Sequence, residues 1–537
     1  MPAGSGACSV ADAPDRVAPT ESWGYTPRVI ANAATQAVGL GSEYSRYDAL
    51  ELGRMIQARE VSPLELVESV IESIERLNPV LNSVVCRLDD DARRAAQGPL
   101  PKGPLSGVPM LLKDLLSPYA GKPFTSGSRL YANYIPDTDA ELVRRYKAAG
   151  LIITGKTNTP EFGILPVTEP ELFGACRNPW NVDRTPGGSS GGAAASVAAG
   201  IVPVAHGGDG GGSIRIPAAC CGLFGLKPTR GRNPCGPDAS EHWLGFAVEH
   251  VLTRSVRDSA ALLDVSSGPE PTSPYWAPPN ARPFLDEVGV APGRLKIAFT
   301  TEPHLPGRVH ADCVAAVQDA ARLCESLGHT VVEAGPKING EEFAFHFFLI
   351  ICASVAGGIR AFEHFAKRSA QPEELELSTR LAGLLGAQLG AGDTIAAMAA
   401  LQAAARDVMR FYGEYDVLLT PVLGAPPLPL GALQPRGAEL IAQQTVARLK
   451  LGPALKFRRI IEATVSRVFE FVPFSPIANV TGQPSMSVPL FWNNQGLPIG
   501  TMFTGRFGDE ATLLRLAAQL EAARPWQNRR PPVRIGQ

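Results

Sequence analysis

The sequence has few of the patterns that mark a metal or disulfide protein. Its nine cysteines are an odd number without any CxxC spacing, and Cys220 and Cys221 are adjacent. The eight histidines form no HExxH or HxxxH pair on one helical face. These absences argue against a disulfide framework and against a zinc site. We therefore predict no metal, and we expect a reducing cytoplasm as the location.

An excess of charge of one sign is also absent. Lysine and arginine total 50, aspartate and glutamate total 52, and the net charge is −2. Proteins whose main partner is nucleic acid or an anionic membrane usually carry a basic excess, so we predict neither partner. No apolar run approaches the ~18 residues expected of a membrane-spanning helix. The composition is compatible with a homodimer.

The first forty or so residues are small and polar, with little hydrophobic periodicity. They lack the basic region and the apolar region of a signal peptide. We expect residues 1–42 to form a loosely ordered N-terminal arm.

Regular elements follow this arm. Ser62, Pro63 and Glu65 form the pattern of a capping box, with proline at the first helical position. Apolar residues then recur at helical spacing, and Asn78-Pro79 is predicted to end the helix. Beyond it, short apolar runs such as 108–112 alternate with helical segments, without a linker of distinct composition. This alternation predicts one large α/β domain.

The stretch from about 335 to 470 differs, because it reads as mostly helical. Four phenylalanines lie close together near its start: Phe343, Phe345, Phe347 and Phe348. Any single one of them is expected to serve core packing. As a group, they make this helical insertion the place where we expect a substrate pocket.

Glycine gathers in two short segments, GGSSGG at 187–192 and DGGGSIR at 209–215. Glycine is costly in ordered structure, so dense runs suggest backbone held close to something or in conformations that other residues avoid. Both segments contain serine and precede a helix-compatible sequence. A serine such as Ser213, at a helix N-terminus after three glycines, would lie among several free backbone N–H groups, as an oxyanion hole requires.

Three other interpretations of these segments were weighed. A flexible Gly/Ser linker is disfavoured by the apolar helical flanks. A phosphate-binding loop would need GxxxxGK[ST], which does not occur, so no cofactor is predicted. The GGSSG stretch fits the G-x-S-x-G nucleophile elbow of α/β-hydrolases. That fold usually places a histidine near its C-terminus, whereas the last histidine here is His364.

Several blocks together resemble the amidase signature family, and the resemblance covers nearly all of residues 47–527. The blocks are GPLSGVPMLLKD at 103–114, GKTNTPEF at 155–162, RNPW at 177–180, TPGGSSGG at 185–192, DGGGSIR at 209–215, GLKPT at 225–229 and NVTGQP at 479–484. The sequence looks most like the bacterial branch of 6-aminohexanoate-cyclic-dimer hydrolases and aryl acylamidases. The resemblance implies an amidase signature domain over 43–530, with a central mixed β-sheet flanked by helices and a catalytic core at about 100–230.

The resemblance also implies a Ser-cisSer-Lys triad. Ser213 corresponds to the nucleophile, Ser189 to a bridging serine on a cis peptide after Gly188, and Lys113 to the general base. The amides of Gly210, Gly211, Gly212 and Ser213 are expected to form the oxyanion hole. One departure is Gly210, because many members carry a larger apolar residue there.

The residues themselves allow plainer interpretations at several positions. A Lys-Asp dipeptide usually forms a simple ion pair, here between Lys113 and Asp114. Asp209 and Arg215 are expected to brace the nucleophile loop by charge-assisted hydrogen bonds. His206 is expected to be structural.

Two positions of the insertion are candidates for the substrate pocket. Cys352 and Phe348 could line it, although a buried structural cysteine is the more common case.

The functional expectation is hydrolysis of bulky uncharged amides, anilides or cyclic amides through an acyl-enzyme, with carbamates and esters as further substrates. A glutamine-dependent amidotransferase subunit that releases ammonia for a partner is the alternative. A silent binding protein on the same scaffold is the third hypothesis, and nothing in the sequence supports it.

Overall fold

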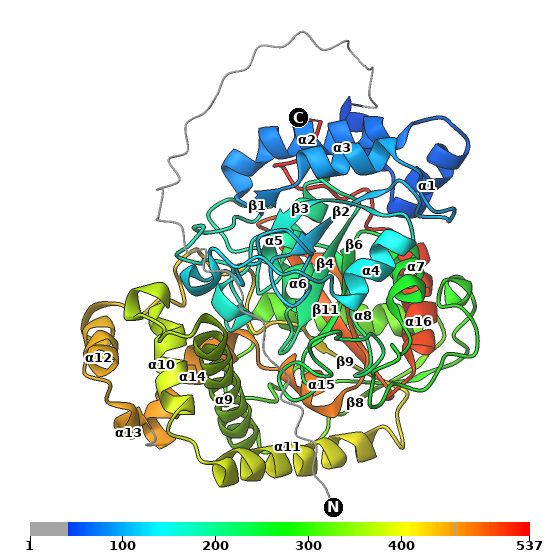
Figure 1. Ribbon diagram of the computed structural model, residues 1–537. Helices are drawn as coiled ribbons and strands as arrows, with labels where there is room; N and C mark the ends of the chain where they lie inside the picture. Colours follow the sequence, from blue (N-terminus) through cyan, green and yellow to red (C-terminus); the bar gives the residue numbers. More distant parts are fainter. Residues whose placement is uncertain (1–40, 456–457, 537) are drawn as a thin grey trace, which may run out of the picture. The chain divides into compact units, whose positions relative to one another are not determined.

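A mixed β-sheet of eleven strands organises the part of the chain that the computed structural model describes, residues 41–455 and 458–536 (Figure 1). The expected arm at 1–42 lies almost wholly outside these residues. The strand order is β1-β3-β2-β4-β6-β5-β10-β11-β9-β7-β8. The strands are β1 (Val84–Arg87), β2 (Pro109–Lys113), β3 (Ile152–Thr157), β4 (Val204–Asp209), β5 (Phe224–Lys227), β6 (Val248–Thr253), β7 (Lys296–Phe299), β8 (Thr330–Glu333), β9 (Val417–Pro421), β10 (Ser485–Trp492) and β11 (Pro498–Gly505). The predicted α/β class with a mixed sheet is confirmed.

Strand direction within the sheet positions the candidate site. β2 pairs in parallel with β3 on one side and with β4 on the other. β4 then pairs antiparallel with β6, and β10 pairs antiparallel with both β5 and β11. Because parallel neighbours end at the same edge of a sheet, Lys113 at the end of β2 and Asp209 at the end of β4 lie at one edge.

Helices cover the sheet and extend beyond it. They are α1 (Ala49–Gln57), α2 (Pro63–Leu81), α3 (Asp89–Gln97), α4 (Glu141–Ala148), α5 (Gly191–Ala198), α6 (Arg215–Cys221), α7 (Val256–Ser266), α8 (Ala311–Ser326), α9 (Gly340–Ala366), α10 (Leu377–Gly386), α11 (Ala391–Phe411), α12 (Gly437–Arg448), α13 (Gly452–Leu455), α14 (Arg458–Phe471), α15 (Pro476–Thr481) and α16 (Glu510–Ala523). Leucine, valine and alanine side chains from both strands and helices form the buried core.

Helix α2 shows both a correct and a wrong prediction. Its capping box forms, since Ser62 Oγ accepts a hydrogen bond from the Glu65 amide at 3.2 Å and Glu65 accepts one from the Ser62 amide at 2.7 Å. The predicted stop at Asn78-Pro79 is wrong, because the helix continues through Pro79 to Leu81. Proline removes one hydrogen bond near the end of the helix. The Asn78 side chain forms hydrogen bonds with the backbone of Ser83 and Val84, which follow the helix.

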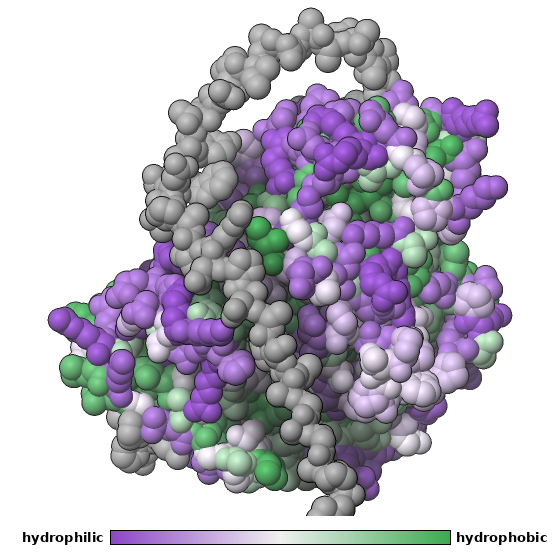
Figure 2. Space-filling model, in the orientation of Figure 1, coloured by the Kyte–Doolittle hydropathy of each residue, from purple (hydrophilic) through white to green (hydrophobic). Residues whose placement is uncertain are grey.

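Helices α9, α10, α12, α13 and α14 form a group beside the sheet, at the lower left of Figure 1. By length and hydropathy α9 could cross a membrane, although no uninterrupted apolar run marks it, because His346, Ser354 and Arg360 lie within it. The core helix of a soluble protein can have the same length and hydropathy. In α9, 44% of the most apolar window is buried. Figure 2 shows hydrophobic side chains exposed over this group, and Ile441 is 65% exposed.

Candidate active site

Lys113 lies at the buried end of β2, where its amine reaches a serine. All five residues of β2 are buried, and Lys113 itself is fully buried. Its Nζ atom donates a hydrogen bond to Ser189 Oγ at 2.7 Å. The lysine side chain is therefore buried at the end of an apolar strand, and its amine contacts Ser189 in the first Gly/Ser segment, residues 187–192.

The surroundings of Lys113 favour its neutral form. Burial lowers the pKa of Lys113 to about 7, against the opposing influence of the negative charges of Asp209 and Glu249. Desolvation disfavours the charged form of an amine, which explains this direction. A large fraction of the amine is thus unprotonated near neutral pH, as a general base requires.

Asp114 does not pair with its neighbour in sequence. Its Oδ1 lies 3.4 Å from the amine of Lys156, a second fully buried lysine, and its Oδ2 accepts a hydrogen bond from Thr125 Oγ1 at 2.6 Å. The simple Lys113–Asp114 pair is therefore the wrong interpretation. Successive side chains of an extended strand point to opposite faces, so the two groups separate.

Ser189 lies directly before α5, in a closely packed stretch of backbone. The peptide bond between Gly188 and Ser189 is cis. Gly163, at φ +68°, approaches Ser189 so closely that a Cβ at this position would lie 3.1 Å from Ser189 Oγ and 2.6 Å from a Leu115 methyl carbon. A side chain at position 163 would crowd the Ser189 hydroxyl and the Leu115 side chain. Glycine at this position leaves room for both.

Ser213 belongs to the loop 210–213, which links β4 to α6. Its carbonyl accepts a hydrogen bond from the Ser190 amide at 3.3 Å, so the two Gly/Ser segments lie against each other. Exposure increases from 0% at Lys113 to 2% at Ser189 and 9% at Ser213. Of the three residues, Ser213 is thus the one that solvent reaches most easily.

The loop amides are not equally available. The Gly212 amide donates to Asp209 Oδ1 at 2.8 Å, and the Ile214 amide donates to Asp209 Oδ2 at 3.1 Å. Gly212 was expected among the oxyanion donors, but its N–H already has a carboxylate partner. The candidate donors therefore narrow to the amides of Gly210, Gly211 and Ser213.

Asp209 and Arg215 form a fully buried ion pair beneath the loop. Arg215 donates from Nη2 to Asp209 Oδ1 at 2.9 Å and from Nε to Oδ2 at 3.0 Å. Burial alone would raise the pKa of the Asp209 carboxyl, but the charge and hydrogen bonds of Arg215 hold it well below its usual range. The pair remains ionised and braces the loop from below.

Asn479 completes this brace from the far end of the chain. Its side-chain amide donates to the Asp209 carbonyl at 2.8 Å and to Asp209 Oδ1 at 2.9 Å, while its oxygen accepts from Arg215 Nη2 at 2.7 Å. The sequence places Asn479 in one of the family-like blocks but does not reveal this role.

His206 lies behind Lys113 in a buried polar network. Its Nδ1 lies 3.4 Å from the Lys113 amide, and its Nε2 lies 3.0 Å from Glu249 Oε2. Glu249 also accepts a hydrogen bond from Ser117 Oγ at 2.6 Å. Sequence reasoning missed Glu249 and Ser117. Glu249, the one carboxylate in the strand segment 248–253, was the available signal.

On the insertion, Phe347 of α9 contacts the loop. Its ring lies 3.6 Å from the position of a Cβ on Gly211, and it stacks on Phe246 with ring centroids 5.9 Å apart. The two predicted pocket residues, Phe348 and Cys352, lie one turn apart on α9; Phe348 is half-buried and Cys352 fully buried. Of the four phenylalanines expected near the pocket, Phe347 is thus the one whose ring lies next to Gly211, whereas the pocket role of Phe348 and Cys352 stays a prediction.

The comparisons with known proteins agree with this architecture. Residues 65–514 match the family model described as Amidase. The chain is 37% identical over 494 residues to a 6-aminohexanoate-cyclic-dimer hydrolase of Pseudomonas sp. (strain NK87), an alignment that covers 90% of this chain and 96% of that protein. The chain therefore belongs to the amidase family, and the predicted resemblance is confirmed.

Solved structures show the same relationship. A 6-aminohexanoate cyclic dimer hydrolase complexed with substrate superposes with a TM-score of 0.83 at 35% identity, covering 91% of this chain and 99% of that chain. A bacterial aryl acylamidase of the amidase signature family superposes with a TM-score of 0.77 at 28% identity, covering 89% and 96%. The protein is thus an amidase, a hydrolase that acts on amide bonds.

Proposed function

We propose that the chain hydrolyses amides by acyl transfer to Ser213, with Ser189 as proton relay and Lys113 as general base. The observation that carries the proposal is the 2.7 Å hydrogen bond between Lys113 Nζ and Ser189 Oγ, at a lysine whose pKa is lowered to about 7 by burial. Serine needs such a neighbour, because its hydroxyl is a weak nucleophile until its proton is removed.

The steps follow from this arrangement. Ser213 Oγ bonds to the carbonyl carbon while its proton passes to Ser189 and the Ser189 proton passes to neutral Lys113. The amides of Gly210, Gly211 and Ser213 are the donors for the negative oxygen that forms. The proton then returns through Ser189 to the nitrogen, the C–N bond breaks, and the amine leaves. Water, activated through the same relay, cleaves the acyl-enzyme to the carboxylic acid.

The surroundings support an uncharged substrate with apolar bulk. Phe347 and Phe246 border the loop, and Arg215 is fully engaged by Asp209 and Asn479. Cyclic amides and anilides suit such a site, and Phe348 and Cys352 are proposed to extend the pocket along α9. Carbamates and esters contain the same acyl carbon and are proposed as further substrates.

A matched panel of an anilide, a cyclic amide, an ester, a carbamate and free glutamine tests the proposal. We expect turnover of the first two to exceed glutamine hydrolysis clearly. Fluorophosphonate should label Ser213, and Ser213→Ala should lose both labelling and turnover. Ser190→Ala is the control, because among the described residues the hydrogen bonds of Ser190 Oγ go to the backbone of Gly208 alone. Full anilide turnover by the Ser213→Ala protein would contradict the proposal.

A further inference from the structure

The indole ring of Trp243 packs directly on Gly210. A Cβ on Gly210 would lie 2.9 Å from Cε3 and 3.1 Å from Cζ3 of this ring, and 3.4 Å from the Ala247 Cβ. A separation below 3.0 Å is too short for two carbon atoms, so only glycine fits beneath the ring as it stands. The position at which the family resemblance predicts a larger apolar residue is thus filled from a different part of the chain.

An unusual turn holds Trp243 in place. His242 and Ala247 pair as an antiparallel bridge, and between them Trp243 and Leu244 adopt left-handed φ values of +50° and +53°. The Gly245 amide donates to the His242 carbonyl at 3.2 Å. Bulky residues avoid this region of backbone conformation, and strain of this kind concentrates at functional sites. Trp243 is half-buried.

The turn and the nucleophile loop share one support. The Asn479 side-chain amide that donates to the Asp209 carbonyl also donates to the Phe246 carbonyl at 3.0 Å. Phe246 is buried and stacks on Phe347, which borders Gly211. The position of Trp243 is therefore fixed relative to Gly210 by hydrogen bonds as well as by contact.

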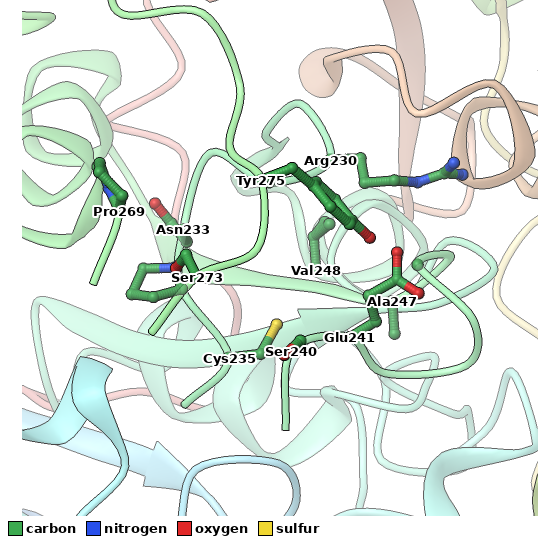
Figure 3. Close-up of a pocket in the computed structure, with 14 residues that line it drawn as sticks. Arg230, Asn233, Cys235, Ser240, Glu241, Ala247, Val248, Pro269, Ser273 and Tyr275 are labelled. Atoms are coloured by element: carbon green, nitrogen blue, oxygen red, sulfur yellow. The ribbon is translucent and has the colours of Figure 1, made fainter. Parts of the chain in front are cut away.

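A cavity lies next to the turn. Glu241, Gly245 and Ala247 contribute to its wall, together with residues such as Cys235 and Tyr275. Figure 3 shows Cys235 and Ser240 on one side of it and Arg230 and Tyr275 on the other. The cavity is lined by neither of the two serines nor by Lys113. The cavity therefore borders the turn through Gly245 and Ala247, and Trp243 is not among its lining residues.

We propose that Trp243 forms the wall of the acyl pocket above Gly210 and limits how bulky a group the site accepts next to the carbonyl. The inference rests on the proposed function, because it takes the loop 210–213 as the place where the carbonyl binds. Trp243 acts as a specificity-determining residue, and Gly210 is its complement. Enlarging one member of the pair requires shrinking the other.

A double-mutant cycle tests this pairing. Wild type, Gly210→Ala, Trp243→Ala and the double variant are compared on acetyl and benzoyl p-nitroanilides. Trp243→Ala should raise the benzoyl-to-acetyl ratio of kcat/KM by about tenfold or more, in the range that small changes of pocket volume produce. Gly210→Ala should lower kcat/KM for both substrates about tenfold or more in wild type, but less in the Trp243→Ala background.

Trp243→Phe is included as a milder variant, and Trp276→Ala, whose side chain is 55% exposed, as the control. The control should leave the ratio unchanged. An unchanged ratio in active, folded Trp243 variants, or equal effects of Gly210→Ala in both backgrounds, would each overturn the inference. Wild-type protein without anilide turnover or Ser213 labelling would instead refute the proposed function.

Discussion

The amine of Lys113 lies 2.7 Å from the hydroxyl oxygen of Ser189, although 76 positions separate the two residues. Neither group has appreciable contact with solvent, because Lys113 is 0% and Ser189 2% exposed. A proton that moves between them does not exchange freely with bulk water. In the proposed mechanism, this enclosure lets Lys113 take the role that histidine has in the Ser-His-Asp triad.

The pKa of Lys113 predicts the pH dependence of catalysis. Because burial lowers the pKa to about 7, the amine is protonated and inactive below that pH and neutral above it. kcat/KM should therefore rise about tenfold per pH unit below 7 and level off above about 8. Steady-state hydrolysis of an anilide from pH 5 to 9, at constant ionic strength, measures this curve.

Lys113→Met should lower kcat/KM by about 10²–10⁴-fold and remove the rise near pH 7, because the titrating base is gone. Lys102→Met, at an exposed lysine, should keep both the activity and the acid limb. A variant without Lys113 that retained the same acid limb would assign the titration to another group.

Ser189→Ala should separate the relay from the nucleophile. Without this hydroxyl the proton of Ser213 has no path to the amine, so kcat should fall by about 10²–10⁴-fold. Fluorophosphonate should still modify Ser213, more slowly, and peptide mapping locates the adduct. Modification at residue 189 in the wild-type protein would reverse the two roles.

Gly163→Ala should damage the site by crowding Ser189. The new Cβ would lie 3.1 Å from the Ser189 hydroxyl, at a position with φ +68°. Gly289→Ala is a matched control, because its φ is +90° and, apart from its chain neighbours, no heavy atom of the described residues lies within 4 Å of the new Cβ. Both variants introduce a side chain into the left-handed region, at a cost of about 1 kcal/mol or more in stability.

We expect only Gly163→Ala to lower kcat strongly, measured on an anilide at saturating concentration. Thermal unfolding should show a loss for both proteins, larger for Gly163→Ala because its Cβ also meets Leu115 at 2.6 Å. Equal kcat values in the two variants would mean that the Ser189 hydroxyl tolerates the added carbon.

Arg215→Met should destabilise the protein by about 3–5 kcal/mol, because it leaves the buried Asp209 carboxylate without its cation. Urea unfolding monitored by circular dichroism measures the loss. Asp407→Asn disrupts the exposed pair with Arg410 and should leave the unfolding midpoint nearly unchanged. A small effect of Arg215→Met would show that another group or water neutralises Asp209.

Much of the fold could be predicted because local patterns agree with the final structure. The capping box at Ser62 forms, and the apolar run 108–112 corresponds to β2, which is shifted by one residue to 109–113. The end of α2 was missed, because the side-chain bonds of Asn78 to residues 83 and 84 support a helix that contains Pro79. That support comes from the following strand, and local propensity does not report it.

The site was predictable only where sequence blocks mark it. Lys113, Ser189 and Ser213 lie within recognisable motifs, whereas Trp243 and Phe347 act through contacts between segments distant in the chain. The same holds for the partner of Asp114, since Lys156 reaches it across neighbouring strands. Hydrophobic periodicity indicates which face of an element is buried, but not which distant residue it meets.

The position of Asn479 has a consequence for the newborn chain. During synthesis Lys113, Ser189 and Ser213 are added long before Asn479. The Asn479 side chain forms hydrogen bonds with Asp209, Arg215 and the Phe246 carbonyl. Synthesis proceeds from the N-terminus, so a nascent chain shorter than 479 residues contains the three proposed catalytic residues without the hydrogen bonds of Asn479. Amide hydrolysis should therefore require synthesis past residue 479, and fragments that end before this residue should be inactive.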